Sequence, residues 1–157
     1  MGKYDEIFDV VDSEDLIIGK ASRFQVHHNK LMHRSVHILV FNSRESLFLQ
    51  KRSMTKDESP GLWDSSAAGH VESGENYLDC AKRELKEELN LSGVQLDEII
   101  SIPAQIMTFW EHVRVYKCAT DGKICIDKNE ISEGSYFKLS EVRALMQSNP
   151  DMFTSTF

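Results

Sequence analysis

The chain has 157 residues, 41% of them hydrophobic and 27% charged, which suits a single globular domain with a real core. The formal net charge of −7, with Lys and Arg scattered along the chain, argues against a nucleic-acid surface. No stretch is apolar and long enough to span a bilayer and no secretion signal is visible, so we expect a cytoplasmic protein. Cys80, Cys118 and Cys125 are odd in number and lack CxxC spacing, which indicates reduced packing residues rather than disulfides or a zinc site.

The first half of the chain is typical of two β-hairpins separated by a polar segment. Residues Glu6 to Val11 and Leu16 to Ala21 are short β-rich runs that predict the first hairpin. Ser22 to Lys30 is polar and predicted to be helical or looped. Ser35 to Phe41 and Ser46 to Lys51 predict the second hairpin, which we expect to be central in the sheet.

The second half begins with a turn-rich stretch, Ser53 to Gly61, followed by residues Trp63 to Ala68 and a long helix. The later strands are expected at Val113 to Ala119 and Ser135 to Leu139, with Ile124 to Ile126 as a weaker candidate. A closing helix is predicted from a Ser140 cap to about Gln147, with its inward side formed by Val142, Leu145 and Met146. This order of elements fits a mixed sheet between helices, an α/β/α sandwich.

The long helix lies in residues 69–91, GHVESGENYLDCAKRELKEELNL, the most informative segment of the chain. Glu84, Glu87 and Glu88 stand three and four residues apart and therefore share one helix face. Carboxylates at this spacing repel one another unless a cation lies between them. Because no thiolate or imidazole shares that face, the pattern predicts Mg²⁺, with Mn²⁺ as the alternative.

A second face of this helix is apolar and predicts contact with the core. Its members are Leu78, Ala81, Leu85 and Leu89. At the start of the helix, Ser73 is the candidate N-cap with Glu75 in the first turn, and at its end Asn90 tolerates a left-handed cap conformation.

The segment resembles the Nudix box, Gly-x5-Glu-x7-Arg-Glu-U-x-Glu-Glu-x-Gly-U, in which U is aliphatic. The matching residues are Gly69, Glu75, Arg83, Glu84, Leu85, Glu87, Glu88 and Leu91. Asn90 replaces the second glycine of the box and is the next residue to tolerate positive φ. The resemblance implies one Nudix domain over residues 1–157 with an α/β/α sandwich.

The resemblance also assigns roles to the charged residues of the box. It implies Glu84, Glu87 and Glu88 as metal ligands and Arg83 as the residue that orients these carboxylates. Glu75 would support the preceding loop and bind a further ion.

Segments outside the box resemble the isopentenyl-diphosphate isomerase branch of Nudix proteins. They are His33-Arg34, Phe41-Asn42, Gln50 to Ser53, Pro60 to Trp63 and Gly69-His70. The isomerases use a catalytic cysteine just before the Gly-His pair and a catalytic glutamate in a later strand. Here Ala68 occupies the cysteine position, and an ungapped alignment puts His112 at the glutamate position, one residue from Glu111. Because alanine cannot exchange a proton, we expect a hydrolase on an isomerase-like scaffold.

The predicted reaction is attack of water on a diphosphate linkage in a nucleoside-diphosphate-type or other organic diphosphate substrate. Glu87, Glu88 and Arg83 are the predicted catalytic residues. The proton acceptor is open among Glu87, Glu88, Glu111 and Glu130.

Two basic residues at the end of a predicted strand are candidate phosphate contacts. Arg52 is the stronger candidate and Lys51 the weaker one. The alternative for Arg52 is a surface cation without a ligand role.

Three histidine positions match or lie near metal ligands of the isomerases: His33, His70, and either His27 or His28. In the same alignment Trp110 and His112 replace two glutamate ligands of that site. An isolated histidine is more often a hydrogen-bonded packing residue, so a second metal site is an alternative rather than an expectation.

Two other functions remain open. An isomerase-like enzyme would move a double bond without releasing phosphate, and a non-catalytic binding module would usually have lost glutamates of the box, none of which is missing here. The expected partner is a small-molecule diphosphate whose organic group the sequence does not identify. The oligomeric state is also open, with a homodimer among the alternatives.

Overall fold

The computed structural model of this chain describes residues 5–157. Its strands are β1 (Ile7–Val11), β2 (Ile17–Ser22), β3 (His33–Phe41), β4 (Leu47–Arg52), β5 (Trp63–Asp64), β6 (Ala67–His70), β7 (Asp97–Ile102), β8 (Glu111–Ala119) and β9 (Ile131–Phe137). Its helices are α1 (Arg23–His28), α2 (Tyr77–Leu89) and α3 (Leu139–Ser148), with the short 3-10 turns η2 (Ile106–Thr108) and η3 (Pro150–Met152). Among the described residues, no helix combines the length and apolar character needed to cross a membrane.

The first predicted hairpin is confirmed, and of the two alternatives for residues 22–30 the structure has the helix, over Arg23–His28. Strands β1 and β2 pair antiparallel from Ile7 opposite Ser22 to Val11 opposite Ile17. Ser22 then caps α1, because its side chain accepts a hydrogen bond from the backbone N–H of Gln25.

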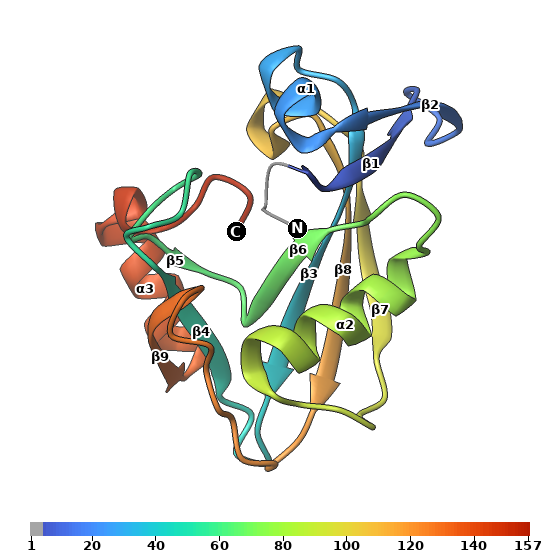
Figure 1. Cartoon of the computed structure of the whole chain (residues 1–157). Helices are drawn as coiled ribbons and strands as arrows, with labels where there is room; N and C mark the ends of the chain where they lie inside the picture. The colour runs from blue at the N-terminus through green and yellow to red at the C-terminus, as the bar shows by residue number, and fades with distance from the viewer. Residues whose placement is uncertain (1–4) are drawn as a thin grey trace.

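The main sheet is mixed and splits on one side of β3. Strand β8 runs parallel to β3 along its whole length, from His33 opposite Glu111 to Phe41 opposite Ala119. On the other edge β3 pairs with β6 at its start and with β4 only at Val40 and Phe41. The second hairpin is therefore formed only near its turn, and β4 diverges to pair with β9 and β5. Figure 1 shows that strands β4, β5 and β9 diverge from β6.

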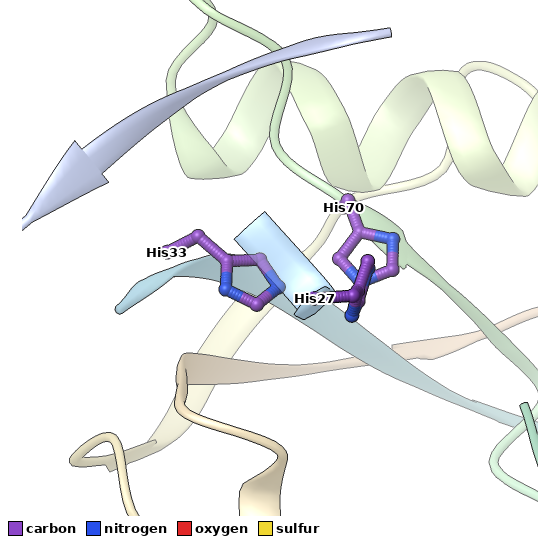
Figure 2. A group of neighbouring side chains, drawn as sticks. All are labelled: His27, His33 and His70. Atoms are coloured by element: carbon purple, nitrogen blue, oxygen red, sulfur yellow. The ribbon is translucent and has the colours of Figure 1, made fainter. Parts of the chain in front are cut away.

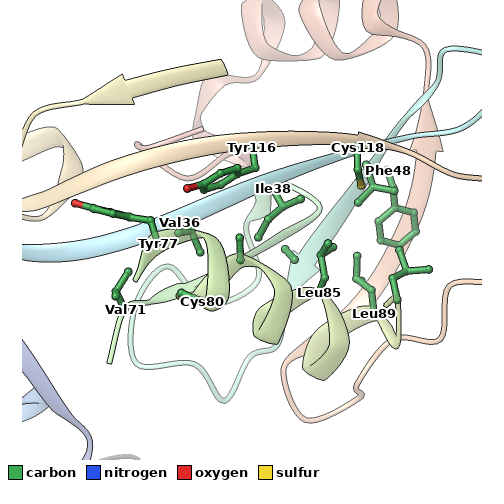
Figure 3. Packing of buried hydrophobic residues seen from close by; sticks show 14 of the residues in the cluster. Val36, Ile38, Phe48, Val71, Tyr77, Cys80, Leu85, Leu89, Tyr116 and Cys118 are labelled. Carbon is green, nitrogen blue, oxygen red and sulfur yellow. The ribbon is translucent and has the colours of Figure 1, made fainter. Parts of the chain in front are cut away.

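Helix α2 covers one face of the sheet with the larger core (Figure 3). Its Cys80, Ala81, Leu85 and Leu89 pack with sheet residues Val36, Ile38, Val40, Tyr116 and Cys118. Leu78, predicted to face inward, is 38% exposed. Tyr77 takes the first inward position instead, so the apolar face begins one residue earlier than predicted.

Helix α3 covers the opposite face with a smaller core of Leu47, Leu49, Val142 and Phe153, against which Leu145 and Met146 pack. Helices thus lie on both faces of a mixed sheet, and the predicted α/β/α sandwich is confirmed.

The ends of α2 agree with the sequence on one side only. Asn90 is the C-cap with φ of 55°, as predicted. The predicted Ser73 cap is wrong: Asn76 caps the helix by accepting from the N–H of Asp79, and Ser73 Oγ donates to Asp9 at 2.8 Å. Glu75 therefore precedes the helix.

Several other boundaries differ from prediction. The last strand starts at Ile131 rather than Ser135, and α3 is preceded by Lys138 as N-cap rather than Ser140. Residues 124–126 form no strand, although Ile124 and Ile126 pack against the larger core. Strand β7, which pairs antiparallel with β8, was not predicted.

Candidate active site

A cavity of about 520 Å³ opens where β4 separates from β6, and residues of β3, β4, β5, β6 and α2 line it. Among residues 5–157, its lining contains ten Asp or Glu side chains and four Lys or Arg side chains. The acidic members are Glu6, Glu58, Asp64, Glu72, Glu84, Glu87, Glu88, Glu111, Asp127 and Glu130, and the basic ones are Arg23, Arg52, Lys56 and Arg83. The cavity is therefore strongly acidic unless cations bind in it.

Glu84 projects from α2 onto the backbone of Gly69 in β6. A Cβ atom at Gly69 would lie 2.0 Å from Glu84 Oε1, so only glycine leaves space for this carboxylate. Glu84 is 9% exposed, and burial, followed by the nearby charge of Glu88, raises its pKa to about 8. The first glycine of the box therefore has a steric role.

Glu88 lies one helical turn further along, is 4% exposed and is held by neutral donors. Its Oε2 accepts hydrogen bonds from Gln50 Nε2 at 3.0 Å and from the backbone N–H of Ala68 at 3.2 Å. Burial raises its pKa to about 7 despite these bonds. Glu88 therefore connects the two sides of the split in the sheet, because Gln50 belongs to β4 and Ala68 to β6.

Arg83 connects the carboxylates of the box. It donates to both oxygens of Glu75 at 2.9 and 3.0 Å, to Glu84 Oε1 at 2.7 Å and to Glu87 Oε2 at 3.3 Å. It also donates to the carbonyl of His70 at 3.1 Å. Although burial opposes its charge, the hydrogen bond to Glu75 and the charge of Glu84 raise the pKa of Arg83.

The carboxylates of the box lie near one another but differ in solvent exposure and in how many of their oxygens are already hydrogen-bonded. The Glu87 side chain is 57% exposed, whereas Glu84 is buried and Glu75 has both oxygens bound to Arg83. Glu84 and Glu88 are two buried carboxylates with raised pKa values, and a divalent cation between them would remove their mutual repulsion. Their oxygen donors suit Mg²⁺ or Mn²⁺. The residues therefore fit the metal that the sequence predicts.

The predicted phosphate contacts separate into one that lines the cavity and one that does not. Arg52 lines it, donates from Nε to the Glu58 carbonyl at 3.0 Å, and lies 3.5 Å from Asp64 Oδ2. Lys51 is not part of the lining. Lys56, which sequence reasoning placed only in a turn-rich loop, lines the cavity and pairs with Glu130.

A histidine cluster adjoins the cavity through His70, the one member of the cluster that is part of the lining. Figure 2 shows His27, His33 and His70 facing one another from α1, β3 and β6. Their ring centroids are 5.1 to 5.2 Å apart. Within residues 5–157, two groups bring three ligand atoms within 4.8 Å of one another: His27, His33 and His70, and Glu58, His70 and Glu111. Glu84, Glu87 and Glu88 form no such group in this structure.

The register of β8 corrects the alignment used for this cluster. Glu111 lies opposite His33, and its Oε1 is 2.9 Å from His70 Nε2 and 3.5 Å from His33 Nε2. His112 points elsewhere and contacts the Asp12 carbonyl at 2.9 Å. A carboxylate therefore remains in the cluster, and burial lowers the pKa of His70, which favours the neutral imidazole that binds metals. His28 is not in either group.

The isomerase cysteine has no replacement at its own position. Ala68 lines the cavity, and the nearby Cys80 is buried and donates to the His70 carbonyl at 3.4 Å. Burial strongly raises the pKa of the Cys80 thiol.

The sequence signal for these distant contacts was weak. Glu111 was considered as a proton acceptor, but its place among the histidines depends on the β3–β8 register. Arg23 lines the cavity and lies 3.3 Å from His70 Nδ1, yet it belongs to no recognisable motif.

Comparisons with known proteins identify the family. The model described as NUDIX domain matches residues 31–156. Isopentenyl-diphosphate Delta-isomerase 2 of Photorhabdus laumondii is 33% identical over 98% of this chain and 89% of its own length. A protein named as a Nudix hydrolase, from Yersinia pestis, is 34% identical over 88% of this chain and 76% of its own length.

A solved structure supports the fold over most of the chain. DR0079 from Deinococcus radiodurans superimposes with a TM-score of 0.80 and 26% identity, covering 92% of this chain and 90% of DR0079. The predicted resemblance to the Nudix family, and within it to the isopentenyl-diphosphate isomerases, is confirmed.

Proposed function

The chain belongs to the Nudix hydrolase family, and we propose that it hydrolyses a diphosphate linkage in an organic diphosphate, such as one of the nucleoside-diphosphate type, with the help of Mg²⁺. Mn²⁺ is the alternative ion. The products are two phosphate-bearing fragments, because water adds to one phosphorus and the bridging oxygen leaves with the other.

The observation that carries this proposal is the charge of the cavity. Among residues 5–157, ten acidic side chains against four Lys or Arg side chains would repel a diphosphate, so its binding requires additional cations. Glu84 and Glu88, whose pKa values are raised by burial, are the residues that gain most from a cation. With the exposed Glu87, they are the proposed metal ligands.

Bound at these carboxylates, the ion would neutralise phosphate charge and lower the pKa of the attacking water. Arg83 holds Glu84 and Glu87 at fixed distances, while its bidentate bond to Glu75 fixes Arg83 itself. The role of Glu75 as a ligand of a further ion stays a prediction.

Arg52 and Lys56 are the proposed phosphate contacts on the β4 side of the cavity. Lys51 stays a weaker prediction. Glu111 Oε1 already lies beside His70 and His33, so we place the proton acceptor among the other three candidates: Glu87, Glu88 and Glu130.

The test is product analysis with Mg²⁺ or Mn²⁺ and with EDTA, across nucleoside diphosphate sugars, dinucleotides, nucleoside triphosphates and isopentenyl diphosphate. Glu87→Gln and Glu88→Gln should each lower turnover by about a hundredfold or more without unfolding the protein. Glu133→Gln is the matched control, because Glu133 is exposed on β9 outside the cavity. Metal-independent cleavage, or normal turnover in both box variants, would remove the proposed site.

The histidine cluster favours a second candidate function, isomerisation of isopentenyl diphosphate. His33, His70 and Glu111 come together as a metal site of the isomerase branch would require. Ala68 opposes it, because a methyl group cannot replace the thiol in proton transfer. Double-bond migration without phosphate release would identify this activity, and the absence of both reactions would favour a non-catalytic binding module.

A further inference from the structure

Two buried hydroxyl groups in the cavity have no hydrogen-bond partner among residues 5–157. They are Ser35 Oγ and Thr154 Oγ1. Ser35 is 3% exposed and Thr154 8%, and both residues line the cavity. A buried hydroxyl without a partner costs roughly 1–3 kcal/mol, so two of them in one cavity are unfavourable unless a ligand supplies partners.

Ser35 has a fixed direction because β3 is paired on both edges at this residue, with β6 and with β8. Val36 enters the core under α2, so the pleat directs Ser35 to the opposite face, towards the cavity. His37 shares that face, and its Nδ1 lies 2.8 Å from Ser65 Oγ and 3.5 Å from Asp64 Oδ1. Asp64 in turn contacts Arg52, so the face of β3 that carries Ser35 and His37 lies beside this proposed phosphate contact.

Thr154 belongs to the C-terminal segment, which forms part of the cavity wall with Thr154 and Thr156. Its backbone N–H donates to the Trp63 carbonyl at 3.0 Å, and the next residue, Ser155, donates from Oγ to the Met107 carbonyl at 3.0 Å. Anchored on both sides, the segment keeps the Thr154 hydroxyl buried.

Little apolar surface is available in the same cavity. Within the described part of the chain, residues 5–157, the only lining residues without a polar side chain are Ala68, Gly69 and Phe109. A hydrocarbon chain gains about 25 cal/mol for each Å² of apolar surface that it buries, and this cavity offers it few aliphatic partners.

From these observations we infer that Ser35 and Thr154 are specificity-determining residues that hydrogen-bond the organic group of the substrate. That group carries hydroxyl or amide functions, as a sugar or nucleoside does, and is not an isoprenoid chain. The inference rests on the proposed function, since it assigns the organic group of the same diphosphate.

The experiment compares kcat/KM for a nucleoside diphosphate sugar and for isopentenyl diphosphate in the wild type, Ser35→Ala and Thr154→Val. Each substitution should lower kcat/KM for the nucleoside diphosphate sugar about tenfold and leave that for isopentenyl diphosphate unchanged. The melting temperature should not fall, because each change removes a hydroxyl that has no partner in the protein. Thr120→Val, outside the cavity lining, is the control for kcat/KM, and because its hydroxyl accepts from the N–H of Gly122 at 2.9 Å, its melting temperature should fall where that of Thr154→Val does not.

Binding of a methylene-bridged nucleoside diphosphate, measured by calorimetry with Mg²⁺, separates the two proposals. Absence of hydrolysis together with binding that weakens about tenfold in both variants would refute the proposed function and retain the subsite. Two results would retain the proposed function and overturn the inferred roles of Ser35 and Thr154. One is hydrolysis by the wild type with equal kcat/KM for both substrates. The other is a ratio of the two kcat/KM values that neither variant changes. No binding and no hydrolysis would overturn both.

Discussion

Replacement of Gly69 by alanine tests the packing on which the carboxylate site depends. The added Cβ would lie 2.0 Å from Glu84 Oε1, 2.1 Å from its Cδ and 2.6 Å from its Cγ. Ordinary contacts between such atoms begin at about 3.5 Å, so the Glu84 side chain must move by roughly 1.5 Å. That movement breaks the 2.7 Å bond from Arg83 to Glu84.

Two effects of different size should follow. Overpacking costs about 1–3 kcal/mol, which lowers the melting temperature by roughly 2–12 °C for a chain of this length. Displacement of a proposed metal ligand by more than 1 Å should lower kcat/KM by about a hundredfold. Calorimetric unfolding and steady-state hydrolysis of the preferred diphosphate measure the two effects separately.

Gly19→Ala is the matched control. No atom lies within 4 Å of a Cβ at Gly19, so this variant should keep the activity and stability of the wild type. Wild-type turnover and melting temperature in Gly69→Ala would refute the steric argument, since they would mean that Glu84 does not occupy this space.

Two further predictions concern stability. Glu84 and Glu88 have pKa values of about 8 and about 7 in the folded protein, above the ordinary 4.5, so the folded state binds more protons than the unfolded state. The free energy of unfolding of the EDTA-treated protein should therefore fall, by on the order of 6 kcal/mol, as the pH rises from about 5 to 8. Denaturant titrations should show a weaker fall in Glu88→Gln, and an equal fall would contradict the assignment. Asn90→Ala should lose about 1 kcal/mol because φ is 55°, whereas Asn90→Gly should lose none, as thermal unfolding would show.

Local periodicity predicted the elements whose two faces differ in polarity. Helix α2 and strand β3 show such patterns, and their positions were predicted within a few residues. Strand β7, residues Asp97–Ile102, is exposed along nearly its whole length, so its sequence DEIISI has no alternation to detect. The split of β4 from β3 depends on pairing with β9, from Arg52 opposite Ile131 to Leu47 opposite Phe137, and no local pattern encodes pairing over such a separation.

The candidate site likewise combines contacts that follow from local spacing with contacts that depend on long-range pairing. The approach of Glu84 to Glu88 follows from helix geometry and was predictable from spacing. The bond from Gln50 to Glu88 crosses 38 residues, and the approach of Glu111 to His33 requires the parallel register of β3 and β8. Such contacts depend on the tertiary fold, which explains why an alignment without gaps placed His112 in the cluster.

The burial of the carboxylates links the stability of this site to its proposed metal. The only basic residue that contacts several of them, Arg83, is already shared among Glu75, Glu84 and Glu87 within the described chain. Glu88 receives hydrogen bonds from neutral donors, and burial keeps its pKa raised although the charge of Lys56 opposes that effect. An ion that binds Glu84 and Glu88 must therefore displace protons at neutral pH, so its affinity should rise with pH. Because it binds the folded state, it should stabilise the protein most at the alkaline pH where the metal-free form is weakest.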